Sequence, residues 1–85
     1  MRFEFTRAAL RDLRGIPTKD AESIAGTLAT IAEDAFGSHP QAKPLQGMRG
    51  WYRLRRGDWR VIYRIDARAG VVMVQAIKHR REVYR

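Results

Sequence analysis

Arginines are spaced along two segments in the C-terminal half of the chain in a way that suits one face of a β-sheet. Arg53 and Arg55 are two residues apart in the first segment, and Arg60 and Arg64 are four apart in the second. Even spacings put side chains on the same side of a strand. If the segments pair across Gly57-Asp58, Arg55 and Arg60 become neighbours. Because a guanidinium holds phosphate through two parallel hydrogen bonds, the pattern predicts a phosphate-binding surface.

The positive charge is concentrated in the last 35 residues. This part holds nine arginines and one lysine against three acidic residues, whereas the first 50 residues hold seven basic and six acidic ones. The pI near 11.1 implies an acidic partner, and fourteen of the seventeen basic residues are arginine. Because a purely electrostatic membrane binder would have no such preference for arginine, the composition favours nucleic acid.

A tyrosine and a further arginine, Tyr84 and Arg80, follow the third apolar segment and can fold back toward the same surface. Cleavage of RNA through its own 2′-hydroxyl needs an aligned 2′-oxygen, stabilisation of charge on the phosphate, and proton transfer, but no metal. Arginines supply the charge stabilisation. Tyrosine has a pKa of about 10, and nearby cations favour its ionised form, so Tyr84 is a candidate acid or base. Trp51, Tyr52 or Trp59 could stack on a base.

Other kinds of site find little support in the composition. The chain has no cysteine, which excludes disulfides and thiolate metal sites and fits a reducing cytoplasm. His39 and His79 are far apart and no carboxylate cluster joins them, so no metal site is expected. No apolar run approaches the roughly 20 residues that a bilayer needs, and the first residues lack the apolar core of a signal peptide.

The first half of the chain is predicted to form one strand and two helices. Arg2–Phe5 alternates as a half-buried strand does, and Thr6 can cap the helix that follows. Gly15 and Pro17 end that helix, and Thr18 is the predicted N-cap of the second. The predicted buried faces have helical spacing: Ala9, Leu10 and Leu13 in the first helix, and Ala21, Ile24, Ala25, Leu28, Ile31, Ala32 and Ala35 in the second.

The second half is predicted to be a loop followed by a three-stranded antiparallel meander. Gln41–Gly50 is the loop, and the strands span Trp51–Arg56, Trp59–Asp66 and Val71–Lys78, before a basic tail over His79–Arg85. Strands and helices are segregated, which predicts a single α+β domain over residues 1–85 with the order β-α-α-β-β-β. The helical hairpin must bury its apolar stripe against one face of the sheet, which leaves the other face to the arginines.

Simpler structural roles are open for each of these residues. A basic strand face can be merely solvated, and Tyr84 can be an aromatic residue that packs on the sheet edge. His79 falls opposite Arg80 by strand parity, so it is expected to be structural or orienting. Trp51 and Trp59 are expected to pack in the core or at its rim, because so small a core needs large side chains.

Three stretches of the sequence form a combined motif. They are Lys-Pro-Leu-Gln-Gly (43–47), Trp-Tyr-Arg-Leu-Arg-Arg-Gly-Asp-Trp-Arg-Val-Ile-Tyr (51–63) and Lys-His-Arg-Arg-Glu-Val-Tyr (78–84). Together with the length and the strand-helix-helix opening, they resemble the RelE/ParE superfamily of bacterial toxins. The RelE branch implies the toxin of a toxin-antitoxin module, which cleaves mRNA in the ribosomal decoding site without a cofactor or metal.

The resemblance also implies roles for particular residues. The family places basic residues on the second and third strands, an arginine after the fourth strand, and a tyrosine near the C-terminus. Two of the strand positions are often lysine, but here both are arginine, a poor base because it keeps its proton above about pH 12. The implied catalytic residues are Arg55, Arg60, Arg80 and Tyr84, and the implied RNA-binding residues are Arg53, Arg55, Arg56, Lys78 and Arg81.

The same resemblance implies particular partners in the cytoplasm. An acidic cognate antitoxin would cover the arginine face, the helical-hairpin groove, or both. mRNA in the decoding site and ribosomal RNA would be the other partners, operator DNA would be contacted only through the antitoxin, and no membrane would be involved. Two alternatives are open: a ParE-like inhibitor that acts by binding DNA gyrase, and a catalytically inactive co-repressor that binds DNA with its antitoxin.

Overall fold

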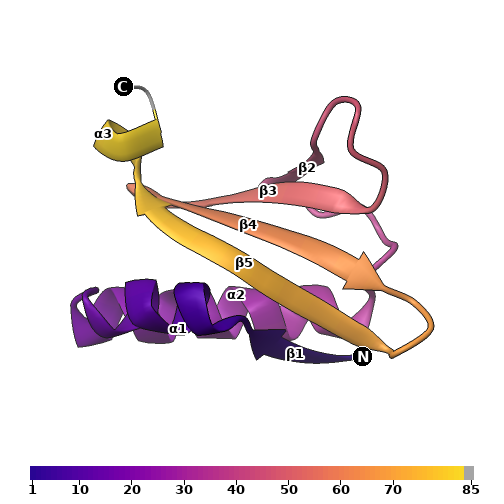
Figure 1. The fold of residues 1–85 in the computed structure, drawn as a ribbon, viewed down its shortest axis with the longest axis horizontal. Coiled ribbons are helices and arrows are strands. Elements are labelled where there is room, and N and C mark those ends of the chain that lie inside the picture. The colour runs from indigo at the N-terminus through magenta and orange to yellow at the C-terminus, as the bar shows by residue number, and fades with distance from the viewer. Residues whose placement is uncertain (84–85) are drawn as a thin grey trace.

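Within residues 1–83, which the computed structural model describes, five strands form one sheet and two helices cover one of its faces (Figure 1). The predicted α+β class and order of elements are confirmed, with two short additions: a strand within residues 41–50 and a helical turn near the C-terminus. The elements are β1 (Arg2–Phe5), α1 (Arg7–Arg14), α2 (Thr18–Glu33), β2 (Ala42–Pro44), β3 (Trp51–Arg56), β4 (Trp59–Asp66), β5 (Val71–His79) and α3 (Arg80–Val83).

The strands are arranged in the order β1-β5-β4-β3-β2. Strands β3, β4 and β5 form the predicted antiparallel meander, and β1 pairs in parallel with β5, which therefore has a neighbour on both sides. The predicted loop over Gln41–Gly50 is wrong for Ala42–Pro44, which pairs with β3. These residues lack the alternation of a strand. Their pairing is imposed by the neighbouring strand, since the Arg55 amide donates to the Gln41 carbonyl at 2.9 Å.

The two helices begin and pack much as predicted, with two corrections. Thr6 caps α1, because its Oγ1 accepts from the Ala9 amide at 3.1 Å. Ala9 is fully buried, but Leu10 is exposed, so only part of the predicted apolar face meets the sheet. Pro17 and not Thr18 holds the N-cap position of α2, because the Pro17 carbonyl already accepts the first helical hydrogen bond. No helix in residues 1–83 is long and apolar enough to cross a membrane.

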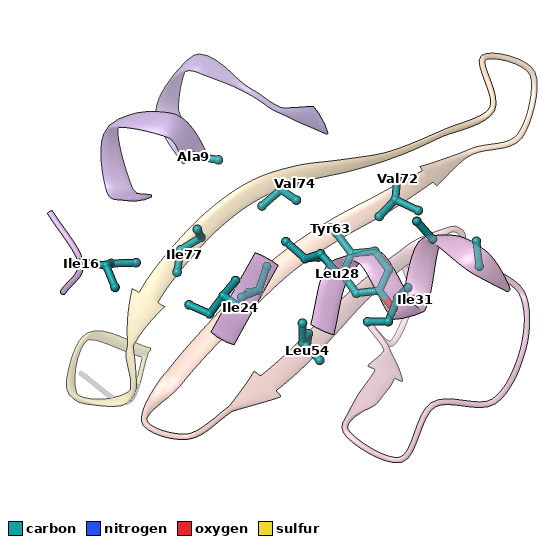
Figure 2. Close-up of a cluster of buried hydrophobic side chains, with 13 residues drawn as sticks. Ala9, Ile16, Ile24, Leu28, Ile31, Leu54, Tyr63, Val72, Val74 and Ile77 are labelled. Carbon is teal, nitrogen blue, oxygen red and sulfur yellow. The ribbon is translucent and has the colours of Figure 1, made fainter. Parts of the chain in front are cut away.

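Side chains from α2 and the strands meet in one core (Figure 2). Leu28 and Ile31 of α2 lie against the sheet beside Tyr63 and Leu54, and all four are at most 1% exposed. The sheet therefore has one face covered by helices, so charged side chains in the middle of the strands lie on the other face. Of the predicted second-helix stripe, Ala21 and Ala25 are only partly buried, and Ala35 lies beyond the end of α2. The buried residues of the stripe are Ile24, Leu28, Ile31, Ala32 and Ala35.

One extra residue in β5 interrupts its alternation. Ile62 pairs with Ala76 and the next residue, Tyr63, pairs with Val74, so Gln75 has no partner across β4. Such a β-bulge breaks the period of two and shifts every later side chain to the opposite face.

The positions after the bulge show its effect. Ile77 joins the core, although strict alternation after Val74 would point it away from the helices. Lys78 is paired with Arg60 on the open face, and His79 is paired with Trp59 on the helix-covered face. Without the bulge, Lys78 and His79 would exchange faces.

A carboxylate of α1 completes the edge of β5 beyond the end of β1. Asp12 Oδ2 accepts from the Ile77 amide at 3.0 Å, and Asp12 Oδ1 accepts from Lys78 Nζ at 3.2 Å. Just before them, the Thr6 amide donates to the Val74 carbonyl at 3.0 Å. Helix α1 is therefore fixed to the strand that leads into α3.

Tyr63 allows the integrity of this core to be tested at high pH. Burial raises the pKa of Tyr63 from 10 to about 12, and the neighbouring Tyr52 phenol adds to the rise. The two rings stack with centroids 5.2 Å apart. Since the unfolded chain ionises this phenol near pH 10, the stability that it contributes should be intact below about pH 10 and should be lost as the pH rises toward 12.

Urea unfolding followed by circular dichroism at a series of alkaline pH values measures this loss. The matched variant is Tyr63→Phe, which keeps the ring but has no group to ionise, so its stability should fall less steeply over the same range. Equal slopes for the two proteins would show that Tyr63 is not held neutral by the fold.

Candidate nucleic-acid interface

Three cations lie side by side across the open face of the sheet. Arg55 of β3 is paired with Arg60 of β4, and Arg60 is paired in turn with Lys78 of β5. The alignment of the first two depends on the two-residue turn Gly57-Asp58, in which Gly57 has a φ of 57°, a conformation that favours glycine. The predicted proximity of Arg55 and Arg60 is confirmed.

A concavity of about 360 Å³ opens where α3 meets this row of cations. Four arginines line it within residues 1–83: Arg55, Arg60, Arg80 and Arg81. Arg55, Arg80 and Arg81 are exposed. We name this site the arginine concavity. Its arginines come from β3, β4 and α3, and no acidic residue of the described part of the chain lines it. The site therefore suits an anion with several oxygens, such as a phosphodiester.

Arg60 is the most constrained member of the arginine concavity. It is only 6% exposed, and its Nη1 donates to the carbonyls of Gly57 at 3.1 Å and Trp59 at 3.0 Å. In residues 1–83 no ion pair joins Arg60 to a carboxylate, and its Nε and Nη2 make no hydrogen bond. A nearly buried cation without a counter-ion favours the binding of an anion, and here the backbone fixes its orientation in advance.

Arg80 is held at the concavity by the β3–β4 turn. The Arg80 amide donates to the Asp58 carbonyl at 2.7 Å, and Arg80 Nε lies 3.7 Å from Asp58 Oδ1. Both side chains are more than half exposed, so this ion pair contributes little stability and yields readily to a competing anion. The sequence predicts Asp58 only as part of a turn, because its contact with Arg80 arises from tertiary structure.

Several implied RNA-binding residues lie outside the arginine concavity. Arg53 is exposed one row away, between Lys43 and Ile62. Lys78 is drawn by its ion pair toward Asp12. Arg56 extends to the helix-covered side, where its Nε donates to Ser23 Oγ of α2 at 2.7 Å. Tyr84 lies outside the described residues.

The candidate stacking residues are divided between the two faces of the sheet. Tyr52 is paired with the buried Tyr63 and contacts the core, and Trp59 donates through Nε1 to Asp20 of α2 at 3.1 Å. Trp51 is paired with Arg64 and shares the open face with the arginines. Of these three aromatic residues, Trp51 alone is therefore positioned to meet a base on the arginine face.

A second hollow of about 510 Å³ lies between α2 and β3. Gly26, Thr27 and Thr30 line it from α2, and Leu54 lines it from β3. A methyl group added at Gly26 would meet no atom within 4 Å, so crowding within the chain does not explain this glycine. A glycine inside a helix costs about 1 kcal/mol relative to alanine. We name this hollow the α2 groove.

The sequence and the fold were compared with known proteins. The family of ParE toxins of type II toxin-antitoxin systems (parDE) matches residues 3–84. The chain belongs to this family. Toxin RelG of Mycobacterium tuberculosis (strain ATCC 25618 / H37Rv) is 34% identical over 87 residues, which cover 95% of this chain and 92% of the relative. The resemblance to RelE/ParE toxins is therefore confirmed.

Solved structures extend the likeness to the whole fold. The toxin-antitoxin complex RelBE2 from M. tuberculosis contains a chain with a TM-score of 0.75 and 26% identity, covering 92% of this chain and 95% of that one. The isolated E. coli RelE toxin has a TM-score of 0.80 at 23% identity, covering 96% and 88% respectively. The protein is thus a type II toxin with the RelE-like fold.

The arginine concavity should determine how binding of single-stranded RNA depends on salt. The logarithm of the RNA-binding constant falls linearly with the logarithm of the salt concentration. Removal of one phosphate contact should make this slope less steep by about 0.7. Arg55→Ala should produce this change because the Arg55 side chain is exposed within the concavity. Fluorescence anisotropy with a short labelled RNA over a range of salt concentrations measures the slope.

Arg68→Ala is the matched control, because Arg68 is exposed in the turn between β4 and β5, away from the lining residues. An equal reduction in slope for both variants would mean that net charge, and not the concavity, governs the binding.

Proposed function

We propose that this toxin is an endoribonuclease that cleaves mRNA on the ribosome and uses no metal. The observation that carries the proposal is Arg60, a nearly buried arginine without a carboxylate partner in residues 1–83, in a concavity that three further arginines line. A basic surface that serves solubility alone would not keep a cation only 6% exposed and oriented by two carbonyl groups.

The proposed reaction is an intramolecular transfer of the phosphoryl group. The 2′-oxygen of the RNA attacks the adjacent phosphorus, the 5′-oxygen of the next nucleotide leaves, and a 2′,3′-cyclic phosphate forms. The 2′-hydroxyl loses a proton and the leaving oxygen gains one, so water is not consumed. Arg60 and Arg80 would bind the non-bridging oxygens, where negative charge accumulates in the transition state.

The remaining implied residues would act around this centre. Arg55 would contact the scissile phosphate from β3, and Arg53 and Arg81 would bind flanking phosphates or ribosomal RNA. Tyr84 would transfer a proton or stack on the substrate. Because arginine at both strand positions is a poor base, the chemistry would depend more on charge stabilisation and alignment than on a strong base.

Cleavage of message on purified ribosomes tests the proposal. Wild-type toxin should cut the message within codons, and primer extension maps the cuts. Arg60→Ala should slow cleavage by about 10²–10³-fold, the usual cost of removing one group that stabilises charge in a transition state. Tyr84→Phe should also slow it. Arg68→Ala, as the control, should cut at the normal rate, and intact message at a stoichiometric amount of toxin would refute the proposal.

A second candidate function is inhibition of DNA gyrase by binding, and the ParE description of the matching family favours it. It predicts gyrase-dependent double-strand breaks while translation continues. The same set of purified variants distinguishes the two functions. Arg60→Ala should slow cleavage of message, whereas Arg60 has no chemical role in an inhibitor that acts only by binding.

The proposed partner that silences the toxin is an acidic cognate antitoxin. Its support is the net charge of +8 and the α2 groove, together with the likeness to a toxin chain from the RelBE2 toxin-antitoxin complex. An acidic antitoxin segment would neutralise the arginine face, and a second segment would occupy the α2 groove beside Gly26.

Substitution of Gly26 tests the second of these contacts. Gly26→Leu should fill the α2 groove and weaken the antitoxin complex by about tenfold or more, measured by isothermal titration calorimetry. Gly26→Ala is the matched control, because its methyl group enters open space and should stabilise α2. If the leucine variant binds antitoxin as tightly as the alanine variant, the segment does not use this groove.

A further inference from the structure

We infer that His79 is a positioning residue for the arginine concavity, because it caps α3 and so sets the place of Arg81. The consequence for catalysis rests on the proposed function, whereas the consequence for RNA binding does not. His79 is not among the residues that line the concavity, and it lies on the helix-covered face of the sheet, paired with Trp59.

The hydrogen bonds around His79 form a reciprocal cap. His79 Nδ1 accepts from the Arg81 amide at 3.3 Å, and Glu82 Oε1 accepts from the His79 amide at 3.2 Å. This is the arrangement of a capping box, in which the residue before the helix and the glutamate three positions later each satisfy a free amide near the start of the helix. Here an imidazole nitrogen takes the place of the usual hydroxyl or carboxylate oxygen.

Helix α3 depends on this cap more than a long helix would. It spans Arg80–Val83, a single turn, so its first amides have no helical partner and nucleation is unfavourable. Among residues 1–83, Asp58 also holds it: the Arg80 amide donates to the Asp58 carbonyl, and the exposed Arg80–Asp58 ion pair adds little. The cap therefore determines whether Arg81 and the rest of the turn stay over the concavity.

The imidazole ring is itself held from two directions. The edge of one ring faces the other in the Trp59–His79 pair, with centroids 5.1 Å apart and an interplanar angle of 89°. Trp59 is anchored by its hydrogen bond to Asp20 in the first turn of α2. A chain of contacts thus runs from α2 through β4 to α3. It crosses from the covered face to the arginine face, and the bulge at Gln75 is what places His79 on the covered side.

The geometry also fixes the tautomer of the neutral ring. Since Nδ1 accepts a hydrogen bond, the proton of neutral His79 is on Nε2. The ¹⁵N chemical shifts of the ring, measured by NMR at a pH where the ring is neutral, distinguish the two tautomers. A signal from a protonated Nδ1 would overturn the inference.

A double-mutant cycle separates positioning from a general effect on stability. The probe is a labelled single-stranded RNA, and the variants are His79→Leu, Arg81→Ala and the two combined. His79→Leu keeps an apolar group of comparable bulk but lacks the acceptor, and it should weaken RNA binding by about 3- to 30-fold, the range expected for loss of a cap. In the Arg81→Ala background it should weaken binding much less, because its effect passes through that arginine.

Rescue by a different cap completes the experiment. Asparagine is a strong N-cap, so His79→Asn should bind RNA nearly as well as wild type. Glu82→Ala should reproduce the loss seen in His79→Leu, and Glu82→Gln should not. Thermal unfolding of each variant identifies any that fail to fold. If a His79 variant fails to fold, Glu82→Ala and Glu82→Gln take its place in the comparison. Additive effects of His79→Leu and Arg81→Ala, or unchanged binding by both His79→Leu and Glu82→Ala, would refute the inference.

These outcomes are distinct from failure of the proposed function. Coupling in RNA binding without cleavage of message on ribosomes would leave the positioning role intact and reject the endoribonuclease. Cleavage of message by the wild type, together with additive effects of His79→Leu and Arg81→Ala on RNA binding, would support the endoribonuclease and reject the positioning role.

Discussion

The extra residue at Gln75 is the constraint on which both faces of the sheet depend. It lies in β5, the strand between β1 and β4 that also leads directly into α3. Before the bulge, Val74 points into the core; after it, Ile77 does, and Lys78 and His79 take the faces that strict alternation would have exchanged. The cap of α3 and the row of cations therefore follow from a single irregularity in backbone pairing, in keeping with the frequent placement of bulges next to sites.

Segregation of charge follows from covering only one side of a small sheet. An 85-residue chain can bury only a small hydrophobic core, and this core lies on the helix-covered face of the sheet. Cations on the strands can then lie only on the open face or at the edges. Arg56 and Lys78 reach the edges and find Ser23 and Asp12, whereas Arg55 and Arg60 stay together on the open face. Within residues 1–83, Arg60 has no carboxylate partner, whereas Arg80 has only the exposed Asp58.

Sequence periodicity predicted the features that depend on residues close together along the chain. The two helices, the three long strands and the Arg55–Arg60 pair follow from spacing and from the turn at Gly57-Asp58. Features that depend on contacts between distant segments could not be predicted in this way: strand β2, the bulge, the Asp12 contact with β5, and the placement of Arg56 beside α2. The predicted tail over His79–Arg85 is wrong at its start, because His79 completes β5 and a helical turn follows, stabilised by a cap that only the folded geometry reveals.

The arginines of the concavity differ in how they are prepared for an anion. Arg60 is fixed by backbone carbonyls and lacks a carboxylate partner in residues 1–83, so binding a phosphate requires neither reorientation nor the breaking of an ion pair. Arg80 is instead kept in place by an exposed carboxylate that a phosphate can displace at little cost. In the proposed reaction, the first provides electrostatic preorganisation and the second exchanges Asp58 for the substrate. A site built in this way stabilises charge mainly by geometry, which is consistent with the presence of arginine where a base would otherwise be expected.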